Sequence, residues 1–134
     1  MGRGGTADSD VFVELAPAGP LKLSSLVLGL IRNNRFIPKL EFGEEPVAIS
    51  SLEIYGGAPG ARITALIEIA PTLNGPAIIQ MPLVIEPTDE PNRFTATGAV
   101  PIGSLPAGDY VVRAIVGLEG QPSGRVVRTL RKTS

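Results

Sequence analysis

The side chains that could do chemistry in this chain are carboxylates, because histidine and cysteine are both absent. Their absence removes Ser-His-Asp and Cys-His nucleophiles, most zinc sites and the commonest general base. Glu53 and Glu68 could lie on adjacent strands, and Asp89 and Glu90 could reach a cleft, as paired carboxylates do in glycoside hydrolysis. Carboxylates on exposed strand faces are routine, so we interpret all four as solvated surface residues. We therefore expect no enzyme, no catalytic residues and no cofactor.

One loop offers oxygen ligands of the kind that calcium prefers. It runs from Thr88 to Asn92 and contains Asp89 and Glu90, with Asp109 as a further donor. The Asp-x-Asp-x-Asp spacing of dedicated calcium loops is missing. The sequence therefore predicts no metal site.

Basic side chains gather near the C-terminus, at Arg125, Arg128, Arg131 and Lys132. Because alternate residues of a strand point to opposite faces, Arg125 and Arg131 share one face and Arg128 lies on the other. No aromatic side chain accompanies them for base stacking. This pattern indicates a solvated final strand rather than a nucleic-acid site.

Overall charge is nearly balanced, with 12 basic and 13 acidic side chains and a net charge of -1. The acidic counterpart of the C-terminus is the set Glu41, Glu44, Glu45 and Glu53, a separation that we interpret as accidental. Partners selected by bulk charge, such as nucleic acid, are disfavoured. The longest apolar run, Leu26–Ile31, is far shorter than the roughly 20 residues that span a bilayer, so we expect no membrane insertion.

The elements that must position these side chains are strands. Gly (16) and Pro (13) are frequent among the 134 residues and separate runs rich in Val, Ile and Leu. The segment from Leu21 to Ile31 fits either a helical spacing or a buried strand, and we favour the strand. The predicted strands are Val11–Leu15, Leu21–Ile31, Phe36–Phe42, Val47–Tyr55, Arg62–Ala70, Ala77–Ile85, Phe94–Val100, Leu105–Val116 and Arg125–Leu130.

Turn signals join these strands. Pro17–Pro20 should end the first strand, Asn33-Asn34 marks a turn, and Asn74-Gly75-Pro76 should make a hairpin of Ile63–Ala70 and Ala77–Ile85. Pro82 predicts a bulge or an edge in the second arm of that hairpin. The last two predicted strands should form a final hairpin.

This spacing of strands, without long crossover helices, predicts an all-β fold. We expect an immunoglobulin-like antiparallel β-sandwich of about seven to nine strands. The predicted organisation is a flexible leader over residues 1–10 and one sandwich domain over residues 11–132. The leader has one basic residue and no apolar stretch, so we expect neither a signal peptide nor a membrane anchor within it.

The segment LPAGDYVVRAIV, Leu105–Val116, has its own physical logic. Pro106 fixes φ, Gly108 permits a positive φ, and Tyr110 could return its hydroxyl to the loop backbone while its ring fills the sandwich corner. This segment resembles the late hairpin of bacterial immunoglobulin-like and macroglobulin-like domains, and GLEGQPSGRVVRTLRK (117–132) resembles its closing strand.

Upstream, LKLSSLVLG (21–29) and FIPKLEFGEEPVAISSLEIYG (36–56) are similar to accessory domains that follow von Willebrand-type adhesion domains in some bacterial surface proteins. The resemblance implies a non-enzymatic interaction or structural module in a larger surface or exported protein. It also implies an extracellular or periplasmic location, with any export signal outside this chain. The expected partner is a protein or a neighbouring domain.

Two alternatives stay open. A carbohydrate-binding module would need an aromatic platform drawn from Phe12, Phe36, Phe42, Tyr55, Phe94 and Tyr110. Self-association through edge strands would follow from Ile- and Val-rich strands with few edge guards.

Overall fold

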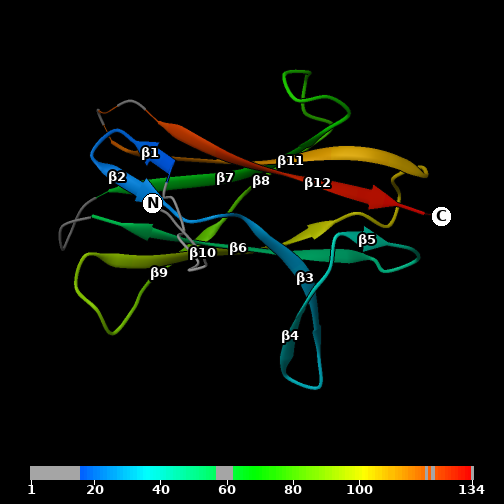
Figure 1. The fold of residues 1–134 in the computed structure, drawn as a ribbon, viewed down its shortest axis with the longest axis horizontal. Helices are drawn as coiled ribbons and strands as arrows, with labels where there is room; N and C mark the ends of the chain where they lie inside the picture. Colours follow the sequence, from blue (N-terminus) through cyan, green and yellow to red (C-terminus); the bar gives the residue numbers. More distant parts are fainter. Residues whose placement is uncertain (1–15, 57–61, 120, 122, 134) are drawn as a thin grey trace, which may run out of the picture.

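The computed structural model describes residues 16–56, 62–119, 121 and 123–133. It is all-β, with two sheets stacked as the layers of a sandwich (Figure 1). The seven-stranded sheet contains β1 (Ala16–Ala18), β2 (Leu21–Leu23), β3 (Val27–Arg32), β4 (Arg35–Pro38), β6 (Val47–Tyr55), β9 (Val84–Pro87) and β10 (Arg93–Pro101). The five-stranded sheet contains β5 (Glu41–Phe42), β7 (Ile63–Ala70), β8 (Ile79–Pro82), β11 (Gly108–Leu118) and β12 (Gly124–Lys132).

The first sheet is organised around β6. Its main order is β1-β2-β6-β10-β9, and β2 and β3 follow one another along the same side of β6. The second sheet has the order β5-β12-β11-β7-β8, in which all neighbours are antiparallel except β5 and β12. The predicted strand character of Leu21–Ile31 is confirmed, although Ser24–Leu26 divides it into β2 and β3.

Alternating apolar side chains build the core between the sheets. In β7, Ala65, Ile67 and Ile69 point inward, as the period of two predicted. Leu52 and Ile54 of β6 meet them from the other sheet as members of the same buried cluster.

The structure has twelve strands in its described part, more than the seven to nine expected, because three predicted strands each divide in two and β1 was not predicted. Phe36–Phe42 becomes β4 and β5, which belong to different sheets. Ala77–Ile85 becomes β8 and β9, and only β8 forms the predicted hairpin with β7. The chain leaves β8 after Pro82, turns at the buried Leu83 and joins the other sheet. Pro82 thus marks an edge strand, as expected.

Other turn predictions have mixed outcomes. Pro17 lies within β1, so the chain turns at Gly19–Pro20 and not over the whole of Pro17–Pro20. The leader and the strand predicted at Val11–Leu15 lie outside the described residues.

The corner predicted at Tyr110 is confirmed. The ring is buried at the start of β11, and its hydroxyl donates a hydrogen bond of 2.6 Å to the Pro106 carbonyl. Gly108 has a φ of 154°, which the missing side chain permits. The final hairpin of β11 and β12 is confirmed too, with Val112 opposite Arg128 near its middle.

The edge strands are better protected against pairing with a second chain than the sequence suggested. Among the described strands at a sheet edge, β1, β4, β8 and β9 contain Pro17, Pro38, Pro82 and Pro87 respectively. The remaining edge strand, β5, has two residues. Proline cannot donate to a ladder, so these edges are poor templates for pairing with a second chain.

Candidate functional site

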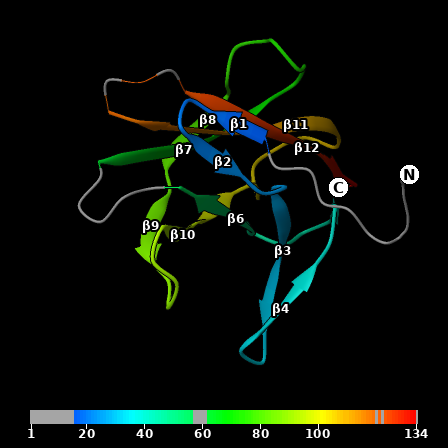
Figure 2. The same ribbon diagram turned by 60° about the vertical axis from the view of Figure 1, so that its left-hand side comes forward.

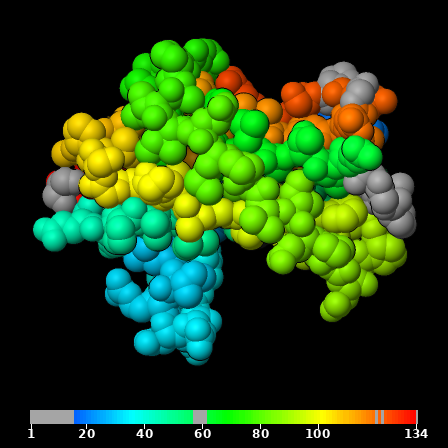
Figure 3. Space-filling view, turned by 180° about the vertical axis from the view of Figure 1, so that it is seen from behind, coloured from blue at the N-terminus to red at the C-terminus, as the bar shows by residue number. Residues whose placement is uncertain are grey.

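The β3–β4 hairpin projects away from both layers of the sandwich (Figures 1 and 2). The space-filling view from behind also shows it as a protrusion from the body of the molecule (Figure 3). Asn33 and Asn34 form the turn that was predicted, with φ values of 54° and 63°. Positive φ at both central residues is typical of a type I′ hairpin turn, which asparagine tolerates.

Large apolar side chains of this hairpin are exposed. The exposed fraction is 56% for Ile31, 37% for Phe36 and 41% for Ile37. Ile31 lies opposite Phe36, so these two share one face, and Ile37 lies on the other face opposite Leu30. Both faces of the projecting hairpin are therefore apolar and partly uncovered.

A close approach at Gly29 shapes the hairpin. A Cβ atom placed on Gly29 would lie 2.7 Å from the ring of Phe36 and 2.3 Å from the Ile37 carbonyl oxygen. Only glycine therefore lets the Phe36 ring lie against β3 at this point. The ring forms one wall of a groove on the outer face of the seven-stranded sheet.

The groove has a volume of about 710 Å³. One end is apolar and formed by the hairpin, whereas the other end is polar. Outward-facing residues of β6 and β10 lie between the two ends. The lining includes Val27, Ile31, Phe36, Pro38, Ile49, Ser24, Ser25, Ser51, Glu53 and Thr97.

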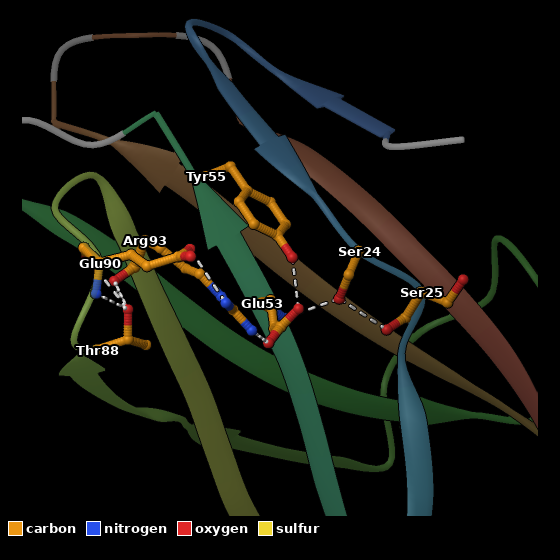
Figure 4. Close-up of polar contacts among 7 residues, drawn as sticks. All are labelled: Ser24, Ser25, Glu53, Tyr55, Thr88, Glu90 and Arg93. Atoms are coloured by element: carbon orange, nitrogen blue, oxygen red, sulfur yellow. Dashed lines mark hydrogen bonds and ion pairs between the residues drawn. The ribbon is translucent and has the colours of Figure 1, made fainter. Parts of the chain in front are cut away.

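The polar end is held by a network around Glu53 (Figure 4). One carboxylate oxygen accepts a hydrogen bond of 2.5 Å from the Tyr55 hydroxyl, and the other accepts one from the Arg93 guanidinium. Ser24 fixes the strand beneath by accepting a hydrogen bond of 2.8 Å from the backbone N–H of Glu53. Arg93 also binds the Glu90 carboxylate at 3.1 Å and lies over the Tyr55 ring.

These contacts set the protonation states of the network. The hydrogen bond from Tyr55, and then that from Arg93, lowers the pKa of Glu53 below its ordinary value. The hydrogen bond to Glu53 in turn raises the pKa of Tyr55. The hydrogen bond to Glu53, and then that to Glu90, raises the pKa of Arg93. Glu53 is thus a firmly ionised acceptor, the opposite of what a general acid needs at neutral pH.

The adjacent-strand arrangement suggested for Glu53 and Glu68 is wrong. Glu53 lies on β6 and Glu68 on β7, in different sheets and on outer faces. Neither carboxylate is a fully solvated surface group either. Glu53 is half-buried and pairs with Arg93, and Glu68 is covered and pairs with Arg113 at 2.8 Å. Local alternation gave the face of each strand correctly, but not which strands are neighbours.

The loop considered for calcium is held by hydrogen bonds of its own. The Thr88 hydroxyl donates to the Arg93 carbonyl at 2.9 Å and accepts from the backbone N–H of Glu90 at 3.2 Å. Asp109 lies in the other sheet, where its carboxylate pairs with Arg131 at 3.0 Å. Within the described residues no three or more carboxylates form a group that could hold a metal ion.

The C-terminal arginines follow the alternation expected of a strand and point in different directions. Arg125 donates to the Asn74 side chain at 2.9 Å, and Arg131 binds Asp109. Arg128 lines a separate cavity of about 520 Å³ together with Val27 and other residues of the sandwich edge. They do not form a continuous basic stripe.

The acidic residues Glu41, Glu45 and Glu53 also pair with separate partners. Glu45 pairs with Lys39 at 2.8 Å, Glu53 pairs with Arg93, and Glu41 lies 4.0 Å from Arg131. Three of the four carboxylates therefore have a cation within the chain.

Most aromatic side chains of the described part contribute to the fold. Phe42 and Tyr110 are buried, Phe94 packs against the core, and the Tyr55 hydroxyl is bound to Glu53. Phe36 is the exposed one. Phe12 lies outside the described residues.

The projection of the β3–β4 hairpin was not predicted from the sequence. Asn33-Asn34 predicted the turn, but the exposure of Ile31 and Phe36 depends on the hairpin leaving the sandwich. No known family model matches the chain, and no curated protein is significantly similar to it. The described part contains no helix long and apolar enough to cross a membrane.

Proposed function

We propose that this chain is a non-enzymatic interaction module that binds a protein partner or a neighbouring domain through the β3–β4 hairpin. The observation that carries the proposal is the exposure of Ile31, Phe36 and Ile37 on an arm that extends beyond the core. Exposed apolar clusters of this kind mark interaction sites in soluble proteins. The ionised, fully engaged Glu53 supports a binding role rather than a catalytic one.

We further propose that the module is an immunoglobulin-like accessory domain of a larger bacterial surface or exported protein. The bond from Tyr110 to the Pro106 carbonyl supports this, because a tyrosine corner is a recurrent feature of immunoglobulin-like sandwiches. The resemblance of residues 105–132 to the late hairpin of such domains points the same way.

Photo-crosslinking tests the interaction role directly. Benzoylphenylalanine replaces Phe36 in the full-length gene product, with the same label at Val84 as the matched control. Val84 is 61% exposed and lies on β9 of the same sheet, away from the hairpin. We expect position 36 to label one discrete segment of a partner or neighbouring domain, and position 84 to label none.

Competition makes the result specific. Unlabelled wild-type chain should abolish the crosslink, whereas the Ile31→Ser/Ile37→Ser variant should not. Equal and non-specific labelling from positions 36 and 84 would exclude the hairpin as a binding surface.

A carbohydrate ligand is the second candidate. The exposed Phe36 ring lies in the same groove as the hydroxyl-bearing Ser51 and Thr97, which together could stack on and hydrogen-bond a sugar. A glycan array that shows binding by the wild-type chain and none by Phe36→Ala would favour this candidate. If the chain bound no glycan on the array, a carbohydrate ligand would be excluded.

A further inference from the structure

The loop between β7 and β8 contains the one Asn-Gly pair of the chain, Asn74-Gly75. This loop, residues 71–78, rises from the five-stranded sheet (Figure 1), and Asn74 is exposed. An asparagine that precedes glycine can lose its side-chain amide, because the next backbone nitrogen attacks the side-chain carbonyl carbon. Glycine favours this attack, since it has no side chain in the way and a flexible backbone.

The loop favours glycine at position 75 but holds its nitrogen only weakly. A Cβ atom on Gly75 would lie 2.3 Å from the Thr72 hydroxyl oxygen, so a side chain here would force Thr72 to move. The Gly75 N–H donates a long hydrogen bond of 3.4 Å to the Thr72 carbonyl. A bond of this length is weak, so little stabilisation is lost when the nitrogen turns to another atom.

Arg125 of β12 binds the side-chain oxygen of Asn74. Its guanidinium donates a hydrogen bond of 2.9 Å to Oδ1. Attack on the Asn74 carbonyl carbon places negative charge on this oxygen, and a cationic donor at hydrogen-bond distance stabilises that charge. The amide nitrogen Nδ2 forms no hydrogen bond with a described residue, so it can take up a proton from water and leave.

Arg113 fixes the main chain on both sides of the Asn74-Gly75 peptide. Its buried guanidinium donates to the carbonyls of Leu73 and Gly75 at 3.0 Å and 2.8 Å. These two carbonyls lie on either side of Asn74 in the chain. Any change in main-chain length at Asn74 must therefore disturb at least one of the two hydrogen bonds.

We infer that Asn74 is a self-modification site at which Gly75 displaces the side-chain amide, with Arg125 promoting the step. The Gly75 nitrogen loses its proton to solvent and forms a bond to Cγ of Asn74. The Cγ–Nδ2 bond then breaks, and the amide group leaves as ammonia after taking up a proton. Water opens the resulting succinimide at either carbonyl and gives aspartate or isoaspartate. No oxidant, reductant or partner is required, and the site is separate from the β3–β4 hairpin.

The two products affect the loop differently. Aspartate at position 74 keeps the normal main chain and places a carboxylate beside Arg125. Isoaspartate adds a methylene group to the main chain between the two carbonyls that Arg113 holds. We therefore expect isoaspartate to release the loop from Arg113, and aspartate to leave it in place.

Peptide mapping by mass spectrometry tests the site. The full chain is incubated in mildly alkaline buffer, where the attacking nitrogen ionises more readily. We expect modification at Asn74 and far slower modification at Asn33, Asn34 and Asn92, each of which precedes a larger residue. Comparable rates at all four asparagines would overturn the inference.

Substitution of Arg125 tests its role. Arg125→Met should slow the modification of Asn74 about three- to ten-fold, because it removes one hydrogen bond to the developing charge. Arg131→Met is the matched control, since Arg131 lies on the same face of β12 but binds Asp109 and not the loop. Equal rates in the wild type and Arg125→Met would overturn the inference. So would a folded chain that stays unmodified while a synthetic peptide of residues 71–78 is converted.

Hydrogen exchange measures the structural consequence. The isoaspartyl form, purified after incubation, should exchange faster over residues 71–78 than the unmodified chain. Asn74→Asp is the control, because it carries the same charge on a normal main chain and should exchange like the wild type. Equal exchange of the isoaspartyl form and Asn74→Asp would overturn the release of the loop from Arg113.

Discussion

Tyr110 and Pro106 are joined by a hydrogen bond of 2.6 Å, in which the phenolic hydroxyl at the start of β11 donates to a carbonyl four residues earlier. The bond closes the loop that leads into the final hairpin. The ring below it is part of the buried cluster. One side chain thus joins the loop to the core, and its two contributions can be separated by substitution.

Tyr110→Phe should lower the free energy of unfolding by about 1 kcal/mol, because it removes the hydrogen bond and keeps the ring. Tyr110→Ala should cost about 3 to 4 kcal/mol, because it also leaves a cavity. Urea unfolding of both variants measures the difference. Equal losses for Phe and Ala would mean that the ring does not contribute to the core.

Arg113 lies beneath the loop between β7 and β8. It pairs with Glu68 at 2.8 Å and donates to the carbonyls of Leu73 and Gly75 at 3.0 Å and 2.8 Å. Arg113→Met should cost about 3 to 5 kcal/mol, because it leaves the covered Glu68 carboxylate without its cation, with only the hydrogen bond from Gln80 remaining. Hydrogen exchange should also become faster in the loop.

A double variant distinguishes the loss of the ion pair with Glu68 from the loss of the hydrogen bonds to the loop. Arg113→Met/Glu68→Leu should recover much of the stability, because no unpaired charge remains, while the loop stays fast in exchange. The exposed Arg62→Met serves as the control and should change stability little. A double variant no more stable than Arg113→Met alone would contradict this account.

Gly29 can be tested against a second glycine. Gly29→Ala should destabilise the chain by about 1 to 3 kcal/mol, because the new Cβ would meet the Ile37 carbonyl oxygen at 2.3 Å. Gly103→Ala is the control, since its Cβ would make only an ordinary contact of 3.4 Å with Pro46. Thermal unfolding should separate the two variants. Equal midpoints would mean that the hairpin can shift without cost.

Glu45 should make stability depend on acid pH. Its hydrogen bond from Lys39, and then that from the backbone N–H of Gly43, lowers the pKa of Glu45 from 4.5 to about 2. Because the pKa is lower in the folded state, the stabilisation is fully present above about pH 4.5 and is lost as pH falls toward 2. The difference in unfolding free energy between wild type and Glu45→Gln should therefore shrink over this range.

Glu44→Gln is the neighbouring control for that experiment, because the Glu44 side chain makes no contact of this kind with the described residues. Its stability should run parallel to that of the wild type between pH 2 and 4.5. A Glu45→Gln curve that is also parallel would show that the Lys39 pair does not stabilise the fold.

Some of the site was readable from the sequence and some was not. The Asn33-Asn34 turn and the outward direction of Glu53 follow from local signals, and both are confirmed. The partners of Glu53 are less accessible, because Tyr55 is two residues away but Arg93 comes from another strand, 40 residues on. No residue near Glu53 in the sequence indicates that the strand carrying Arg93 pairs with β6.

The sequence by itself determined the all-β class, the inward side of strands such as β7, the Tyr110 corner and the lack of histidine and cysteine chemistry. These depend on alternation and on backbone preferences within a few residues. Only the tertiary structure decided that the chain crosses between sheets at Leu83, that Glu53 and Glu68 lie in different sheets, and that the β3–β4 hairpin projects with its groove. Strand pairing is a choice among distant segments with similar patterns, and it is settled by how whole faces pack together.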